Sequence, residues 1–383
     1  MAEQDALLRT TSGKPRARSL GIPFDGVPGT WNAITDVPGL ELGYATLIEG
    51  TNVRTGVTAI HPRGRANPGD PCAAGYHSQN GNGEMTGVSW VHESGTMAGP
   101  ICITNTHAVG VAHGSIVRWT AIHHPDVAEA WLLPISAETW DGYLNDINGG
   151  HVTEAVGVRA LEAAAAGPID EGSVGGGTGM NCYNFKGGSG SASRVVEYGG
   201  TDYTVGVFLQ ANFGARPELV IRGVAMGSLL ADDDPMAEFF GGGGSMPGAG
   251  SCIAIVVTDA PLLPDQCRAF ARRVTLGLAR TGTTGSHFSG DLFLALSVAN
   301  PGAFTPGARS LYGGNRGALD GLRFIPWGFL DPFYEAVVQA TEEAVLNVLV
   351  TNDEMIGFRG HRTPGLPRER VVAILRERGV IPS

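Results

Sequence analysis

The stretch FFGGGGSMPGAGSCIAIVVTDAPL, residues 239–262, carries the clearest structural signal in the chain. It passes from glycine, serine and proline directly into a continuous run of apolar, largely β-branched residues. Such a run is typical of a strand that is buried on both faces. One small hydroxyl residue, Ser251, stands at the junction and follows Gly250. The junction therefore joins a flexible segment, a candidate nucleophile and a core strand.

The pattern after this run alternates between helix and strand. Residues 264–282 begin with proline and end with glycine, as helices commonly do. Their apolar positions have the i, i+3, i+4, i+7 spacing of one buried face: Cys267, Phe270, Ala271, Val274 and Leu278. Residues 291–299 predict a second buried strand, and residues 332–351 predict a long helix. This order predicts a layered α/β architecture in which helices cover a central sheet or sheets.

The pattern before residue 239 predicts mostly short strands separated by glycine turns. Residues 1 to about 30 are polar and basic, and they resemble an arm. Residues 153–167 predict a helix with an N-terminal threonine cap and a closing glycine. The predicted strands cover residues 57–62, 87–94, 100–106, 203–213 and 218–226.

Composition limits the classes of function. The 383 residues include 58 glycines, which indicates many tight turns. A net charge of −11 without a basic stripe argues against nucleic acid and anionic membrane as partners. We see neither a signal peptide nor an apolar run long enough to span a bilayer. Five cysteines without a CxxC pair indicate reduced thiols, and hence a cytoplasmic enzyme.

Cofactor motifs are missing from the sequence. The glycine-rich segment 175–194 lacks GxxxxGK[ST], and its Lys186 stands before a GG pair, so we reject a nucleotide site. The histidines show no HExxH or similar ligand spacing. We therefore expect no cofactor and no catalytic metal.

Ser251 has two interpretations. A serine hydroxyl is a weak nucleophile without a neighbouring base. If the bond between Gly250 and Ser251 were cut, Ser251 would gain an α-amine with a pKa of about 7.7–8.0, which can act as that base. The alternative is a flexible linker between strands, and composition alone favours the linker.

Two further polar segments are candidates. In residues 282–295, His287, Ser289 and Asp291 alternate, so an extended backbone would project them to one face. The alternative there is a polar turn with His287 at the surface. In residues 136–150, acids stand beside aromatic residues and could bind a ligand's ammonium group, although a solvated loop is the commoner outcome. These residues are Glu138, Trp140, Asp141, Tyr143 and Asp146.

Taken together, segments along nearly the whole chain resemble the DmpA/β-aminopeptidase family. Its members are autoprocessed N-terminal-serine peptidases, also called L-aminopeptidase/D-esterase enzymes. The matching segments follow the family's order: residues 32–50, 55–62, 137–152, 176–194, 209–214, 251–266 and 271–300.

The resemblance implies a four-layer αββα sandwich, similar to N-terminal-nucleophile hydrolases but with a different strand connectivity. It also implies a precursor that cuts itself between Gly250 and Ser251. The products would be an α subunit, residues 1–250, and a β subunit, residues 251–383, intertwined in one domain. The family further suggests a homotetramer of such heterodimers.

The resemblance also implies roles for particular residues. Ser251 matches the nucleophile of both self-cleavage and hydrolysis, and Asn212 matches the oxyanion-hole amide. Ser289 and Asp291 match the pair that hydrogen-bonds the Ser251 amine and hydroxyl. Glu138 matches the carboxylate that receives the substrate's ammonium group.

Two departures from the family leave questions open. Trp140 replaces a tyrosine of the D-Ala-releasing members, and an indole has a donor but no acceptor, so we expect a reshaped substrate pocket. Cys252 follows the nucleophile, so a cut shifted by one residue is the alternative to Ser251 at the new N-terminus.

The implied activity is a serine aminopeptidase or amidase that releases N-terminal residues from small peptides, amides or esters. Preference for α- or β-amino acyl groups stays open. One alternative is an endo-amidase on ω-amino acid oligomers, although those relatives typically use threonine at the cut. The others are an autoprocessed acyltransferase and a non-enzymatic protein in which residues 241–250 are a loop.

Overall fold

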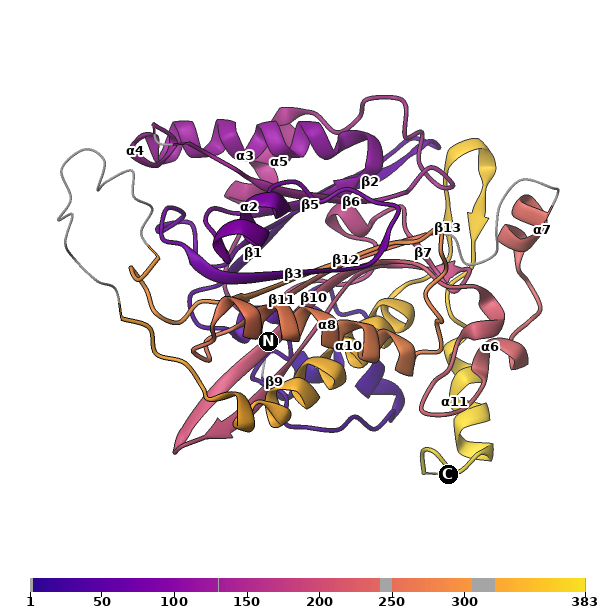
Figure 1. Cartoon of the computed structure of the whole chain (residues 1–383). Helices are drawn as coiled ribbons and strands as arrows, with labels where there is room; N and C mark the ends of the chain where they lie inside the picture. The colour runs from indigo at the N-terminus through magenta and orange to yellow at the C-terminus, as the bar shows by residue number, and fades with distance from the viewer. Residues whose placement is uncertain (1–2, 130, 242–249, 305–320, 383) are drawn as a thin grey trace.

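A computed structural model describes residues 3–129, 131–241, 250–304 and 321–382 (Figure 1). The glycine-rich segment that we expect to give Gly250 room to bend, residues 242–249, lies outside the described residues. Within the described ranges, no helix is long and apolar enough to span a membrane.

Two sheets form the centre of the molecule. The four-stranded sheet has the order β1 (Glu41–Glu49), β2 (Val53–His61), β5 (Ile101–Asn105), β6 (Ile135–Thr139). The six-stranded sheet has the order β4 (Thr96–Met97), β3 (Cys72–Gly81), β12 (Gly290–Ser297), β11 (Ser251–Thr258), β10 (Thr201–Asn212), β9 (Gly188–Tyr198). Strands β11 and β12 are parallel, whereas β10 and β3 run antiparallel to them. Two small hairpins complete the strands: β7 (Asn181–Cys182) with β8 (Phe185–Lys186), and β13 (Met355–Ile356) with β14 (Arg362–Thr363).

Helices cover both outer faces of the paired sheets. Helices α3 (Val109–His123) and α5 (Glu154–Glu162) lie over the four-stranded sheet, and α8 (Pro264–Arg280) and α10 (Asp331–Thr351) lie over the six-stranded sheet (Figure 1). The predicted αββα sandwich is therefore confirmed. The shorter helices are α1 (Glu3–Leu8), α2 (Val88–Ser94), α4 (Pro125–Ala128), α6 (Met226–Leu229), α7 (Pro235–Gly241) and α11 (Arg368–Glu377).

The position of β11 explains its unbroken apolar sequence. Ile253, Ile255 and Val257 belong to the core between the two sheets. Ala254 and Val256 belong to the core between the six-stranded sheet and its helices. Since successive side chains point to opposite faces, a strand between two cores needs apolar residues at every position.

Two predicted strands are wrong. Residues 88–94 form the helix α2 instead, flanked by Gly87 and Gly95 in left-handed conformations (φ 74° and 68°). Residues 218–226 are not a strand but contain a tight turn, because Arg222 and Gly223 both have positive φ (48° and 80°).

The predicted arm is anchored by ion pairs to the body of the protein. Arg16 contacts Glu171 at 2.6 Å, and both side chains are buried. Arg18 contacts Glu343 of α10, also at 2.6 Å. The basic residues of this segment therefore bind it to the body of the protein.

Candidate active site

Ser251 is the first residue of β11, at one end of the six-stranded sheet. It pairs with Asn212, the last residue of β10, and with Gly290, the first residue of β12. Ser251 and Asn212 are only 3% and 6% exposed. The sheet register therefore places the predicted nucleophile beside the predicted oxyanion-hole residue, although 39 positions separate them in the sequence.

Gly250 is held tightly just outside the strand. Its carbonyl oxygen accepts the Gly290 N–H at 3.0 Å. A Cβ atom on residue 250 would lie 2.0 Å from the backbone oxygen of Asn212. Only glycine fits this position without displacing β10, and the Gly250 carbonyl points at a hydrogen-bond donor.

The Trp140 backbone links the nucleophile to Asn212. Its N–H donates to Ser251 Oγ at 3.3 Å, and its carbonyl accepts from Asn212 Nδ2 at 2.9 Å. Trp140 directly follows β6, so this contact joins the two sheets. The Trp140 side chain is 39% exposed, and the backbone of Gly142 packs against its indole.

A second contact fixes the orientation of the Asn212 amide. Asn212 Oδ1 accepts the Asn181 N–H at 2.9 Å, which leaves Nδ2 to act as the donor. The carbonyl of the same peptide, Met180 O, accepts from the Lys186 Nζ at 2.7 Å. Lys186 is fully buried, and burial lowers its pKa well below the ordinary value. The lysine of the rejected phosphate loop therefore supports Asn212 through one peptide unit.

Ser289 and Asp291 are hydrogen-bonded to one another. Ser289 Oγ donates to Asp291 Oδ1 at 2.7 Å, and both side chains are buried. Burial raises the pKa of Asp291, while hydrogen bonds from Ser289, Asn80 and the Cys252 backbone oppose that rise. His287 does not join them: it is exposed and stacks edge-on against Phe288.

Glu138 lies buried near the end of β6. It accepts the Glu84 N–H at 2.9 Å and a hydrogen bond from the Thr106 hydroxyl, and burial raises its pKa. A Cβ on Gly83 would lie 3.3 Å from Glu138 Oε1 and 3.2 Å from Gly290 Cα. The Gly83 backbone therefore lies between Glu138 and Gly290, the residue that pairs with Ser251.

The family is decided by a match over most of the chain. The model of Peptidase family S58 matches residues 32–363. The chain belongs to peptidase family S58. Its resemblance to the DmpA/β-aminopeptidase group is confirmed, and family membership makes it a hydrolase.

Relatives within peptidase family S58 cover nearly the full chain. A β-peptidyl aminopeptidase named BapA from Sphingosinicella microcystinivorans is 46% identical over 95% of this chain and 92% of its own. The solved L-aminopeptidase D-Ala-esterase/amidase from Ochrobactrum anthropi is 42% identical, with a TM-score of 0.88 over 96% of this chain and all of that one. That protein is described as a new variant among the Ntn hydrolase fold. A Burkholderia β-aminopeptidase, also 42% identical, gives a TM-score of 0.84 over 94% of this chain and 98% of its own.

The remaining acids of segment 136–150 separate into two environments. Asp141 is fully buried, burial raises its pKa to about 7, and Asn145 donates to it at 3.1 Å. Asp146 is only partly buried and pairs with His151 at 3.4 Å. The solvated-loop alternative is therefore wrong for Glu138 and Asp141.

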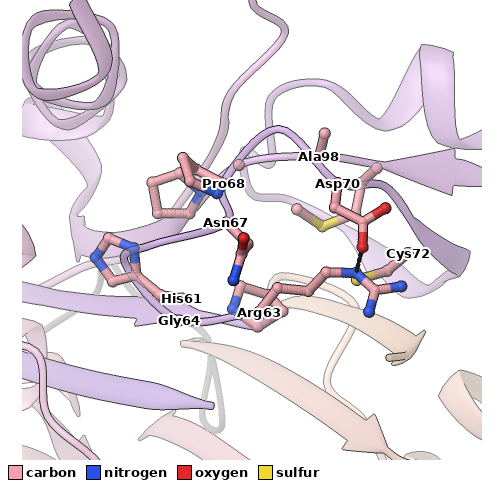
Figure 2. Close-up of a pocket in the computed structure, with 12 residues that line it drawn as sticks. His61, Arg63, Gly64, Asn67, Pro68, Asp70, Cys72 and Ala98 are labelled. Atoms are coloured by element: carbon pink, nitrogen blue, oxygen red, sulfur yellow. Dashed lines mark ion pairs between the residues drawn. The ribbon is translucent and has the colours of Figure 1, made fainter. Parts of the chain in front are cut away.

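A small pocket lies at the far end of β3. Figure 2 shows it lined by His61, Arg63, Asp70 and Cys72, with an ion pair of 3.2 Å between Arg63 and Asp70. Its volume of about 10 Å³ is room for one water molecule. Cys72 and Gly81 are the two ends of β3, and nine steps of about 3.3 Å put this pocket roughly 30 Å along the strand from Gly81, which pairs with Gly290 beside Ser251.

One further polar residue of the site, Asn80, has no recognisable signal in the sequence. Asn80, at the end of β3, donates to Asp291 Oδ2 at 3.0 Å. Among the described residues, no group of three or more His, Cys, Asp and Glu side chains could hold a metal ion. The side chains described above bring hydroxyl, amide and carboxylate groups to the site.

Proposed function

We propose that this chain is a serine aminopeptidase that activates itself by cutting the bond between Gly250 and Ser251. The observation that carries the proposal is the row Asn212, Ser251, Gly290 at the end of the sheet, with Gly250 confined to a glycine-only position beside it. A nucleophile, an amide donor and a polarised carbonyl meet there.

Self-cleavage begins when Ser251 Oγ attacks the Gly250 carbonyl carbon. The Gly290 N–H, 3.0 Å from the Gly250 oxygen, stabilises the developing negative charge. The carbon–nitrogen bond then breaks, the acyl group passes from nitrogen to Oγ, and the proton that Oγ loses passes to the Ser251 nitrogen, which becomes a free amine. Water hydrolyses the resulting ester and releases residues 1–250 and 251–383.

In turnover, the freed Ser251 amine accepts the proton of its own hydroxyl, directly or through water. Oγ attacks the carbonyl of the substrate's first residue. Asn212 Nδ2 and a backbone N–H, for which the Trp140 amide at 3.3 Å from Oγ is a candidate, bind the oxyanion. The amine then protonates the leaving group, and water hydrolyses the acyl-enzyme.

Ser289 and Asp291 bind the Ser251 amine during this cycle. Because the Ser289 hydroxyl donates its hydrogen bond to Asp291, the Ser289 oxygen keeps its lone pairs free to accept an N–H. The Asp291 carboxylate next to it stabilises the ammonium form of the amine. The proton that leaves Oγ therefore has a defined destination.

The substrates are small peptides, amides or esters with a free amino end. A buried carboxylate at Glu138 binds that ammonium group, and the half-exposed Trp140 side chain borders the acyl group. Relatives named β-peptidyl aminopeptidases support β-amino acyl groups among the substrates.

The processed protein is a cytoplasmic homotetramer of heterodimers. All five cysteines are buried and free in the part of the chain that the structure describes, which fits a reducing compartment. Exposed Trp90, Trp131 and Leu133 border one cavity of about 570 Å³, and an apolar surface of this kind fits a contact between copies.

A denaturing gel with N-terminal sequencing tests the proposal. We expect fragments of 250 and 133 residues from the 383-residue chain, with the smaller one beginning Ser-Cys-Ile-Ala. The Ser251→Ala variant should stay full length and inactive, whereas Cys252→Ala should still be cut before Ser251. A single full-length band from an active wild-type preparation would refute self-cleavage, and a fragment beginning at Cys252 would refute the assigned nucleophile.

A further inference from the structure

Asn80 is a polar residue of the site to which the mechanism above gives no role. It lies near the end of β3, opposite Asp291 of β12 in the antiparallel register. Residues directly opposite one another in such a pair share a face of the sheet. The partly buried Asn80 side chain therefore points to the same side as the Asp291 carboxylate.

A β-bulge produces this juxtaposition. Asp291 pairs with Asn80, but the next residue of β12, Leu292, pairs with Ser78. Gln79 is the extra residue, and its exposed side chain accepts from Thr275 of α8 at 3.1 Å. Bulges commonly redirect side chains next to active sites, and this one brings Asn80 into register with Asp291.

The Asn80 amide binds residues on both sides of Ser289 in the sequence. Nδ2 donates to Asp291 Oδ2 at 3.0 Å and to Ser286 O at 3.0 Å. Ser286 O also accepts the Ser289 N–H at 2.9 Å, which closes the turn. One side chain thus fixes the position of Asp291 directly and that of Ser289 through the turn.

We propose that Asn80 is a positioning residue that keeps Asp291 as a carboxylate and so sets the direction of the Ser289–Asp291 hydrogen bond. This inference rests on the proposed function. An ionised Asp291 can only accept, so Ser289 must donate to it and keep its lone pairs for the Ser251 amine. A protonated Asp291 would donate instead, and Ser289 would then direct its own proton towards the amine and block the base.

The surroundings of Asp291 make this support necessary. Burial raises the pKa of Asp291, and the groups that oppose the rise are Ser289, Asn80 and the Cys252 N–H. Burial and the charge of Asp291 in turn raise the pKa of the Cys252 thiol on β11. The structure records no ion pair of Asp291 among the described residues, so hydrogen bonds carry its stabilisation.

The test compares pH profiles of kcat/KM for Asn80→Ala and Asn80→Asp with wild type. Removing the Asn80 hydrogen bond raises the pKa of Asp291, so the acidic limb of the kcat/KM profile moves to higher pH. We expect Asn80→Ala to lose about tenfold below the shifted pKa and to return to within about twofold of wild type at high pH. Asn80→Asp should shift further, because two adjacent carboxylates share one proton.

Gln79→Glu is the matched control, since it adds the same charge one residue away on a side chain that points to α8. Its profile should overlay the wild type. A variant-to-wild-type ratio that stays constant with pH, or a Gln79→Glu shift as large as that of Asn80→Ala, would overturn the proposal.

A direct titration keeps the test independent of activity. In the uncut Ser251→Ala protein, the carboxyl ¹³C shift of Asp291 should titrate at higher pH when Asn80 is alanine. An unchanged midpoint refutes the role of Asn80, whereas an inactive wild type with a shifted midpoint refutes the proposed function alone.

Discussion

Gly250 shows how one residue without a side chain determines the geometry of the proposed cut. We expect Gly250→Ala to slow self-cleavage at least about tenfold, because a Cβ there would lie 2.0 Å from Asn212 O. The carbonyl would leave its hydrogen bond to Gly290, and near-attack alignment would be lost. A gel time course of the purified precursor measures the rate.

Gly114→Ala is the control for this substitution. Gly114 lies in α3, where a Cβ would meet nothing within 4 Å. Its precursor should be cut at the wild-type rate, and equal rates for the two variants would contradict the steric account.

Other residues of the site differ in how far the sequence reveals them. The alternation of residues 287, 289 and 291 predicts the contact between Ser289 and Asp291 but is wrong for His287, because residues 286–289 form a turn and not an extended strand. Asn80 is not predictable in this way, because it is 211 positions from Asp291 and reaches it only through the bulged pairing of β3 with β12. Asp141 carries no signal either, since a buried acid and a solvated one look alike in sequence.

At the scale of elements, one carboxylate of α10 binds both the six-stranded sheet and the N-terminal segment. Glu343 accepts from Arg194 of β9 at 2.6 Å and from Arg18 at 2.6 Å. Although burial raises it, the pKa of Glu343 stays below its ordinary value because Arg194 and Arg18 stabilise the charge.

Removing this carboxylate takes the ion-pair partner from the buried Arg194 and from the partly buried Arg18. In the uncut Ser251→Ala background, we expect Glu343→Gln to lower the free energy of unfolding by about 3–5 kcal/mol in urea titrations. Glu335→Gln, at an exposed position of the same helix, should change it by less than about 0.5 kcal/mol. Similar losses in both variants would show that α10 itself, and not the ion pair, is sensitive.

Secondary structure can be predicted from the sequence where apolar residues recur at one regular spacing. The apolar face of α8 and the unbroken run of β11 are predictable because each core contact recurs at a fixed spacing. In residues 87–94, Val88, Trp90 and His92 alternate as in a strand, yet the left-handed glycines at both ends close a short helix. In residues 218–226, the positive φ of Arg222 and Gly223 turns an apolar run back on itself. Backbone conformations of this kind are set by tertiary packing and not by local periodicity.

At the scale of the whole molecule, the two proposed subunits share one sheet. Strands β11 and β12 come from residues 251–383, and they lie between β10 and β3, which come from residues 1–250. Both outer edges of the β11–β12 pair are therefore hydrogen-bonded to strands of the other proposed subunit. Helices α8 and α10 of the second subunit also cover strands of the first.

This interlacing predicts that the processed protein cannot dissociate without unfolding. We expect both fragments to co-elute as one species from a sizing column in native buffer, at dilutions down to nanomolar. They should separate only in denaturant, in the same transition that removes the far-UV signal of the sheets. Light scattering on the native peak distinguishes a heterodimer from a tetramer of heterodimers. Separation of the fragments while the circular dichroism remains native would contradict a shared sheet, since breaking the β10–β11 and β3–β12 ladders must expose the core between them.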